Sequence, residues 1–519
     1  MQKNPSPNLN KNSKFPTRFS RYTIFLLIII GTAILIRMYF FPLQVPLNSD
    51  ALYYFMYSSD IYQIGELPKD WSPTNNGWPI FVSLFFIIFD SKDIFTLMQI
   101  QRLLSVLISV SISIPVYFLC KKFVARKFAI VGVVLIAFEP RLMINSFLGS
   151  ADPLYLLLVT ASLTLFLCSN KKIVYFSFIL VALATLVRGE GITLFAVMSI
   201  MFFVRYRKEK YKVFLKYLLV LGIFTSIVLP ISIYRIEVIG VDGIFMRTVS
   251  SGDYLVSNLI VDNDSTNKFV SGLELFIKYL VWVMVPNFVI FVPLGLFLVF
   301  RNRSFEKNTL ISAIGILSIP AFYAYTVPVL DTRYLYTLLP MFSVLVTLSI
   351  ERIVGKLNKA NIIIFIIIIS IIVTSLMFYD YQKIDYESEK ESFEITKQVS
   401  SLISPEKTNR INYSPYVKTL QIIDQWPNLS TQMKIERGII TTDYNSLEDY
   451  IMDSRNKGLT HIIVDSKKEH QDFLKEVFSE ENKFPYLKKI YDSKVNGFNY
   501  HVKVFEIDYE LFDSLKIVK

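Results

Sequence analysis

The feature that most constrains this chain is a series of long apolar runs, of which residues 362–378 form the least interrupted. A helix of about 20 apolar residues crosses the roughly 30 Å hydrocarbon core of a bilayer. Soluble cores do not contain such runs, and 53% of the 519 residues are hydrophobic. We therefore expect a polytopic α-helical membrane protein with about 11 transmembrane helices. These are predicted near residues 22–42, 95–120, 128–147, 153–168, 173–187, 191–204, 213–233, 276–300, 309–328, 334–350 and 361–379.

The basic residues indicate the orientation of the chain. With the basic segment 1–21 inside, every dense basic cluster between spans falls in an inner loop, as the positive-inside rule requires. The clusters are Lys121, Lys122, Arg126 and Lys127; Lys171 and Lys172; Arg205, Arg207, Lys208, Lys210 and Lys212; Arg301, Arg303 and Lys307; and Arg352, Lys356 and Lys359. We therefore expect a multi-pass protein of the cell membrane with a cytoplasmic N-terminus. Because the net charge of +11 resides mainly in these short loops, membrane lipids are expected partners and nucleic acid is not.

The membrane domain, residues 22–379, is then predicted to carry two long outer loops, 43–93 and 234–275. The apolar stretch 78–89 is too short to span a bilayer, so we expect a helix that lies along the membrane surface. Two N-glycosylation sequons, at Asn263 and Asn428, fall outside by this topology, whereas the sequon at Asn302 falls inside.

The polar segment 380–519 is expected to form a separate, extracytoplasmic α/β domain. Its predicted elements are strands at 438–442, 459–465 and 500–507, a helix at 446–457 and a turn at 496–497. All three histidines lie here without metal-ligand spacing, and we expect solvated surface positions for His461, His470 and His501. The two cysteines, Cys120 and Cys168, lie at the ends of predicted spans and provide no disulfide framework.

Five groups of charged residues lie at or near the outer ends of the predicted spans. They are Asp50; Glu139 and Arg141 with Asp152; Arg188 and Glu190; Asp331 and Arg333; and Arg102 inside the second span. Charges at membrane depth are costly and usually face a cavity, a partner or a substrate. Structural alternatives remain for four of these positions: a solvated carboxylate at Asp50, a helix start at Asp152, an interfacial pair or lipid-headgroup anchor at Arg188 with Glu190, and a surface salt bridge at Asp331 with Arg333. Arg102 is the hardest to explain structurally, because an unpaired guanidinium inside a span is costly. Convergence on one membrane face favours a common site.

Arginines and carboxylates at an outer membrane face suit group transfer from a lipid-linked phosphate. Guanidinium groups match phosphate oxygens with two parallel donors, and the candidates for binding a polyprenyl phosphate are Arg102, Arg141, Arg188 and Arg333. Asp50 is the candidate base that takes the proton of an acceptor hydroxyl. The expected supporting residues are Glu139, Glu190, Asp331, Tyr53, Tyr54 and Tyr334.

No metal cofactor is required by this chemistry, because arginines can stabilise the departing phosphate. A divalent ion is nevertheless a possible cofactor, held by Asp50 together with Asp152 or Glu139.

Residues 20–350 resemble the GT-C glycosyltransferases, especially the protein O-mannosyltransferase and aminoarabinose-transferase branch. The resemblance rests on five features: an acidic residue in the first outer loop, an Arg in the second span, the stretch from Glu139 to Asp152, a turn similar to the family's Arg-Pro-Glu-Gly type, and a late Arg-Tyr…Pro segment. Here these are Asn48-Ser49-Asp50-Ala51-Leu52-Tyr53-Tyr54, Arg102, the stretch 139–152, Arg188-Gly189-Glu190-Gly191, and Asp331-Thr332-Arg333-Tyr334 with Pro340.

The resemblance implies a polyprenyl-phosphate-linked (dolichyl-type) sugar donor and inversion at the anomeric carbon. Asp50 would be the catalytic base with Asp152 assisting, and the acceptor would be a protein or a lipid-linked glycan. Two other readings of the sequence stay open: a polytopic transporter or flippase for a lipid-linked or polar substrate, and a non-catalytic scaffold with a GT-C-like fold. A transporter usually places its charges near the membrane midplane and often carries inverted repeats.

Overall fold

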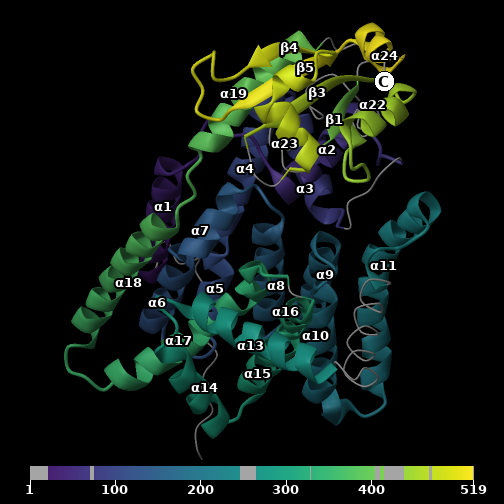
Figure 1. Cartoon of the computed structure of the whole chain (residues 1–519). Coiled ribbons are helices and arrows are strands. Elements are labelled where there is room, and N and C mark those ends of the chain that lie inside the picture. Colours follow the sequence, from purple (N-terminus) through teal and green to yellow (C-terminus); the bar gives the residue numbers. More distant parts are fainter. Residues whose placement is uncertain are drawn as a thin grey trace, which may run out of the picture.

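The structure of the protein is a computed structural model that describes residues 21–69, 75–245, 265–327, 329–403, 410–413, 438–466 and 470–517. The helices of the N-terminal part run alongside one another as a bundle, and a small domain that contains a sheet covers one end of it (Figure 1). The N-terminal segment 1–20 and the sequons at Asn263 and Asn428 lie outside the described residues, as does part of the predicted loop 234–275.

The helices of the bundle vary widely in length. They are α1 (Arg21–Tyr39), α2 (Ser49–Ile64), α3 (Gly77–Phe89), α4 (Ile94–Ser111), α5 (Ser113–Cys120), α6 (Arg126–Ala137), α7 (Pro140–Phe147), α8 (Asp152–Phe166), α9 (Lys171–Val187), α10 (Gly191–Tyr206), α11 (Lys212–Ile239), α13 (Ser265–Met284), α14 (Phe291–Arg301), α15 (Phe305–Leu317), α16 (Ile319–Thr326), α17 (Leu339–Val354) and α18 (Ala360–Gln382), with short 3-10 helices η1 (Arg207–Glu209) and η2 (Thr332–Leu338).

The protein is a mostly helical, multi-pass membrane protein, as predicted, but the number of 11 spans is not established. Among the described residues, 6 helices are long and apolar enough to cross a membrane, or up to 7 if the pair α6 and α7 is counted as one span. That pair is bent by 45° at Glu139-Pro140, where proline has no N–H to continue the helix. The predicted span 276–300 is likewise divided between α13 and α14. Polar and proline breaks therefore divide segments that hydropathy alone joins.

The predicted short apolar helix 78–89 is present as α3, which packs against α2. Trp78 and Phe86 of α3 are fully buried, whereas Leu84 and Ile88 on its other side are exposed. The ring of Phe86 meets Phe55 of α2 in an edge-on contact at 5.6 Å between centroids. The first loop is thus a packed helical element, and its fold fixes where the start of α2 lies.

The C-terminal domain contains a five-stranded sheet in the order β2-β1-β3-β5-β4. Its strands are β1 (Arg410–Tyr413), β2 (Gly438–Ile440), β3 (Leu459–Asp465), β4 (Leu487–Asp492) and β5 (Val502–Ile507), and its helices are α19 (Glu387–Leu402), α22 (Leu447–Arg455), α23 (Asp472–Ser479) and α24 (Tyr509–Ile517), with η3 (Glu481–Lys483). β1 pairs in parallel with β2 and β3, while β5 pairs antiparallel with β3 and β4. The predicted strands and helix of this domain are confirmed, and Ser446 caps α22 by accepting from the Asp449 N–H.

The expectation of solvated histidines is wrong for two of the three. His461 and His470 are only 7% and 4% exposed. His461 lies on the central strand β3, which is covered by helices and by its neighbouring strands. His470 bonds to the buried carboxylate of Asp465, which also accepts from the Tyr500 hydroxyl. The carboxylate of Asp465 satisfies the hydrogen-bonding nitrogen of the His470 ring, so this imidazole can be buried without water.

The C-terminal domain rests on the end of the bundle where α4 begins (Figure 1). The ring of Phe393 in α19 stacks on Phe95 in the first turn of α4, with centroids 5.1 Å apart. α18 leads into α19 after only four residues, 383–386. The domain is thereby held close to the loop that precedes α2, which is where the candidate site lies.

Candidate functional site

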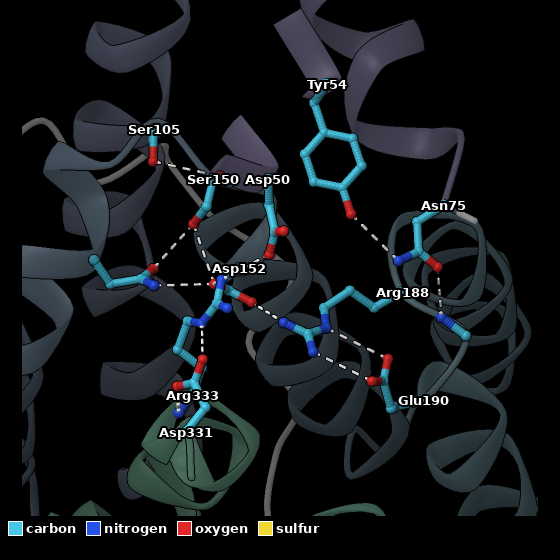
Figure 2. A network of polar contacts seen from close by, with 12 residues as sticks. Asp50, Tyr54, Asn75, Ser105, Ser150, Asp152, Arg188, Glu190, Asp331 and Arg333 are labelled. Carbon is cyan, nitrogen blue, oxygen red and sulfur yellow. Dashed lines mark hydrogen bonds and ion pairs between the residues drawn. The ribbon is translucent and has the colours of Figure 1, made fainter. Parts of the chain in front are cut away.

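Six charged side chains from four parts of the chain meet at this end of the bundle, and we call them the charged cluster (Figure 2). Its members are Asp50 at the start of α2, Asp152 at the start of α8, Arg188 and Glu190 between α9 and α10, and Asp331 and Arg333 at the start of η2. All six were predicted from the sequence as site residues, and the structure brings them together.

Arg333 is the link between the carboxylates. Its Nη1 lies 3.2 Å from Oδ2 of Asp50 and 3.8 Å from Oδ2 of Asp152. Its Nε donates to Oδ2 of Asp331 at 2.6 Å, and its backbone N–H donates to Oδ1 of the same residue. Asp331 therefore caps η2 and orients the guanidinium at the same time. Nη2 of Arg333 has no hydrogen-bond partner in the described part of the chain.

Asp152 is the most tightly held carboxylate of the charged cluster. Its side chain is 10% exposed, and it accepts from Nδ2 of Asn145 at 2.9 Å and from the Ser150 hydroxyl at 3.1 Å. Nη1 of Arg188 also donates to it. Partners from α7, from the α7–α8 turn and from the α9–α10 turn fix this carboxylate, so it has little freedom to move.

Arg188 is held by charges and by aromatic rings. Nε and Nη2 donate to the two oxygens of Glu190 at 3.3 and 3.2 Å. The guanidinium carbon lies 5.8 Å from the ring centroid of Tyr155 and 5.6 Å from that of Tyr334. In the same turn, a Cβ on Gly191 would lie 2.6 Å from the backbone N of Thr185, so the close approach of α10 to α9 requires glycine there.

Asn75 is a site residue that sequence reasoning missed. Its Oδ1 accepts from the backbone N–H of Gly189 at 3.3 Å, and its Nδ2 donates to the Tyr54 hydroxyl at 3.4 Å (Figure 2). Burial raises the pKa of the Tyr54 hydroxyl, which therefore stays protonated. The predicted supporting residue Tyr54 thus lies beside the charged cluster, whereas its neighbour Tyr53 is 45% exposed. In the sequence, Asn75 precedes Asn76-Gly77 and reads as an ordinary turn.

Two cavities meet at Arg333. One, of about 420 Å³, is lined in part by Asp50, Asn145, Ser150, Asp331, Arg333 and Tyr336. The other is lined in part by Asp152, Tyr155, Arg188, Glu190, Arg333 and Tyr334. The side chain of Asp50 is 62% exposed, in contrast to that of Asp152. The second cavity has a volume of only about 20 Å³, roughly the space of one water, so the exposed carboxylate and the shared guanidinium are open to a ligand from the larger cavity.

Arg102 does not face the charged cluster. It is 2% exposed, and its guanidinium donates to backbone carbonyls at 2.7–3.1 Å. These carbonyls belong to Pro42, Val45, Pro46 and Phe147. Carbonyls of the segment before α2 and of the last residue of α7 already occupy the guanidinium, which gives Arg102 a structural role, and phosphate binding at Arg102 stays a prediction. Arg102 instead ties the segment before α2 to α7.

Arg141 and Glu139 also lie apart from the charged cluster. Arg141 pairs with Glu139 at 3.1 Å and donates to the carbonyls of Val285 and Trp282, both at 2.6 Å. Its guanidinium lies 4.7 Å from the ring centroid of Phe378 and 5.3 Å from that of Trp282. This buried pair joins the α6–α7 bend to the end of α13 and to α18, and neither residue lines the two cavities.

In the part of the chain that the structure describes, no group of three or more His, Cys, Asp or Glu side chains has the arrangement of a metal site. Between Asp50 and Asp152 lies the guanidinium of Arg333. That donor set does not fit a divalent ion as it stands, because a cation already bridges the two carboxylates.

No protein-family model matches the sequence, and none of the curated proteins matches it. Solved structures do match. ArnT from Cupriavidus metallidurans bound to undecaprenyl phosphate aligns with a TM-score of 0.57 and 9% identity over 93% of this chain and 98% of that one. The archaeal oligosaccharyltransferase AglB from Archaeoglobus fulgidus, in complex with an inhibitory peptide and a dolichol-phosphate, aligns with a TM-score of 0.55 and 14% identity over 93% of this chain and 74% of that one.

A second structure of the Archaeoglobus fulgidus oligosaccharyltransferase, in complex with Zn and sulfate, aligns with a TM-score of 0.58 and 13% identity over 89% of this chain and 71% of that one. At such low identity the likeness concerns the fold. The resemblance predicted from the sequence is confirmed at that level: the chain has the fold of the GT-C membrane glycosyltransferases ArnT and AglB.

Proposed function

We propose that this protein is a membrane glycosyltransferase that moves a sugar from a polyprenyl-phosphate donor to a protein or lipid-linked glycan acceptor. The observation that carries the proposal is the position of Asp50. Its exposed carboxylate lies 3.2 Å from Arg333 at the edge of a cavity of about 420 Å³, next to the buried pair of Asp152 and Arg188. A base, a phosphate-binding cation and a rigid support for both are thus within one site.

The donor phosphate would bind at Arg333 and Arg188. Nη2 of Arg333 is available among the described residues, and guanidinium groups bind phosphate oxygens with charge-assisted hydrogen bonds. The donor sugar would then lie in the cavity of about 420 Å³ beside Asp50 and Arg333, with Tyr336 in its wall. The lipid ligands in two of the similar structures, undecaprenyl phosphate and dolichol-phosphate, support this class of donor.

Transfer would proceed by inversion. The acceptor oxygen or nitrogen attacks the anomeric carbon, and its proton passes to the carboxylate of Asp50. The bond between the anomeric carbon and the phosphate oxygen breaks, and polyprenyl phosphate departs with the electron pair. Arg333 and Arg188 stabilise the charge that develops on this leaving group. Asp152 acts through the arginines, because its buried oxygens are bonded to protein groups.

The proposed reaction takes place at the outer face of the membrane. The basic loops predict that face for the start of α2, and the C-terminal domain covers the same end of the bundle. The acceptor would approach Asp50 from beneath that domain. Since Arg333 bridges Asp50 and Asp152, the proposed mechanism routes no step through a metal ion.

Sugar transfer in proteoliposomes tests the proposal. The full-length protein is supplied with several polyprenyl-phosphate sugars, and the release of polyprenyl phosphate is measured beside Asp50→Asn at matched amounts. We expect release by the unchanged protein and a loss of about 10²–10⁴-fold in the variant, the range for general bases. Turnover that survives in Asp50→Asn would remove this residue from the chemistry. No turnover with any donor would favour the transporter or scaffold interpretation.

A further inference from the structure

A large groove lies at the end of the bundle opposite the charged cluster. It has a volume of about 760 Å³ and runs between α5 and the last turns of α8. Ile114 and Phe118 of α5 line it and are 43% and 47% exposed, and Leu157, Ala161 and Leu165 of α8 form the other wall. Its volume falls within the range of about 300–1,000 Å³ that is usual for small-molecule sites.

The polar side chains in the walls are turned to the protein's own backbone. Ser111 donates to the Leu107 carbonyl at 2.8 Å, and Thr164 donates to the carbonyls of Thr160 and Pro115 at 2.7 and 3.2 Å. The groove therefore presents an almost entirely apolar surface. A ligand portion that enters it must be a hydrocarbon, since a polar group there would find no partner.

One end of the groove is positively charged. Lys121 and Lys122 follow directly after α5, line the groove and are exposed. Nζ of Lys121 lies 5.8 Å from the ring centroid of Phe118, so the charge borders the apolar wall. Arg126 and Lys127 follow within a few residues in the sequence. An apolar groove that ends at two ammonium groups is complementary to a hydrocarbon chain with an anionic head.

The donor cannot supply this anion while it occupies the charged cluster. Asp152 begins α8, which has 15 residues, and the groove runs along that helix from Leu157 to its other end, next to Lys121 and Lys122. At 1.5 Å per residue the two ends are about 20 Å apart. A donor whose phosphate is bound at Arg333 has no second phosphate for Lys121 and Lys122. The anion that pairs with Lys121 and Lys122 must therefore belong to a lipid other than the sugar donor.

We infer that this groove is a binding site for an anionic phospholipid, with an acyl chain between α5 and α8 and the phosphate at Lys121 and Lys122. The site is independent of the sugar-transfer reaction, and it requires only that the bundle lies in a membrane. It places a lipid contact on α8, the same helix that carries Asp152.

Native mass spectrometry of the full-length protein in detergent tests the site. The protein is titrated with phosphatidylglycerol and with phosphatidylcholine of the same acyl chains. We expect preferential binding of phosphatidylglycerol, and the double variant Lys121→Gln/Lys122→Gln should lose about 25-fold in that affinity. This follows from a factor of about five for each lysine near an anionic headgroup.

The matched control is Lys171→Gln/Lys172→Gln, which removes two exposed lysines at the start of α9 that do not line the groove. It should keep the preference for phosphatidylglycerol. A second variant, Ala161→Phe, fills the groove without changing its charge and should also lose the bound lipid. Equal binding of both lipids, or equal effects of the two lysine pairs, would overturn the assignment. Displacement of phosphatidylglycerol by polyprenyl phosphate at equal concentration would also overturn it, because the groove would then house the donor tail.

Discussion

Substitution of Arg333 tests the proposed donor site most directly. Its guanidinium has three separate contacts: Nη1 with Asp50 at 3.2 Å and Asp152 at 3.8 Å, and Nε with Asp331 at 2.6 Å. Arg333→Lys keeps the positive charge but removes the planar pair of donors and the bond from Nε. Arg333→Gln has a similar length and removes the charge as well. The two variants therefore separate hydrogen-bond geometry from charge.

The expected magnitudes follow from these contacts. One charge-assisted hydrogen bond is worth about 1.5–3 kcal/mol, so Arg333→Lys should lower kcat/KM for the donor by about 10–100-fold. A unit charge pair at about 4 Å contributes about 4 kcal/mol at an effective dielectric constant of about 20. Because the Arg333 side chain is 31% exposed, solvent lowers that figure. Arg333→Gln should accordingly lose about 10²–10³-fold, in line with the removal of one stabilising donor.

The assay is release of polyprenyl phosphate in proteoliposomes, together with thermal unfolding of each variant. Asp152 keeps its bonds with Arg188, Asn145 and Ser150, so we expect both variants to stay folded, with little change in Tm. Equal losses in Arg333→Lys and Arg333→Gln would show that charge has no separate role. A kcat/KM unchanged in Arg333→Gln would refute donor binding at this residue.

Three further predictions concern other parts of the chain. Asn75→Ala should lower kcat/KM by about 2–10-fold, because the neutral hydrogen bonds of Asn75 are lost. Asn75→Asp keeps the acceptor for the Gly189 N–H and should recover part of the activity. Equal activity of the unchanged protein and both variants would contradict a positioning role for Asn75. Burial lowers the pKa of His461, so the folded state binds fewer protons than the unfolded one, and stability should fall as pH drops below about 6.5. The protection factors of the β3 amides, which are corrected for the intrinsic pH dependence of exchange, should therefore fall between pH 7.5 and 5.5, and protection factors that stay constant over this range would be inconsistent with the buried neutral imidazole. In microsomes, glycan should be added at Asn263 or Asn428 but not at Asn302, and glycan on Asn302 would invert the proposed orientation.

The sequence predicts the members of the charged cluster because topology alone brings them together. Asp50, Asp152 and Arg333 each lie at a segment end, and an alternating path through the membrane places those ends on one face. A charged side chain near the membrane has a high desolvation cost, so its presence there indicates a functional or structural partner. No knowledge of side-chain packing is needed to expect that these residues meet.

Reasoning from topology does not predict the role of a polar side chain whose hydrogen-bond partners are backbone groups. Arg102 and Arg141 lie deep in the bundle, as expected for functional charges, but both are occupied by carbonyls at helix ends and breaks. Hydropathy does not reveal which carbonyls a bend at Pro140 or a segment such as 42–46 leaves unpaired. Asn75 is missed for a related reason: its partners are a backbone N–H and a hydroxyl, and neither leaves a pattern in the sequence.

The two aspartates at the centre of the cluster are not interchangeable, although each lies near the same guanidinium. Asp152 is bonded by groups from three parts of the chain, and moving it would break its bonds with Arg188 and Asn145. Asp50 is 62% exposed and meets only Arg333 among the ion pairs of the described residues. A residue that accepts a proton from the substrate must be accessible to that substrate, as Asp50 is. A residue that positions the arginines must be held rigidly, as Asp152 is. A phosphate that binds Arg333 would weaken its hold on Asp50 first, because Asp152 keeps its other bonds. The geometry therefore favours Asp50 as the group that touches the acceptor and Asp152 as the group that fixes the arginines.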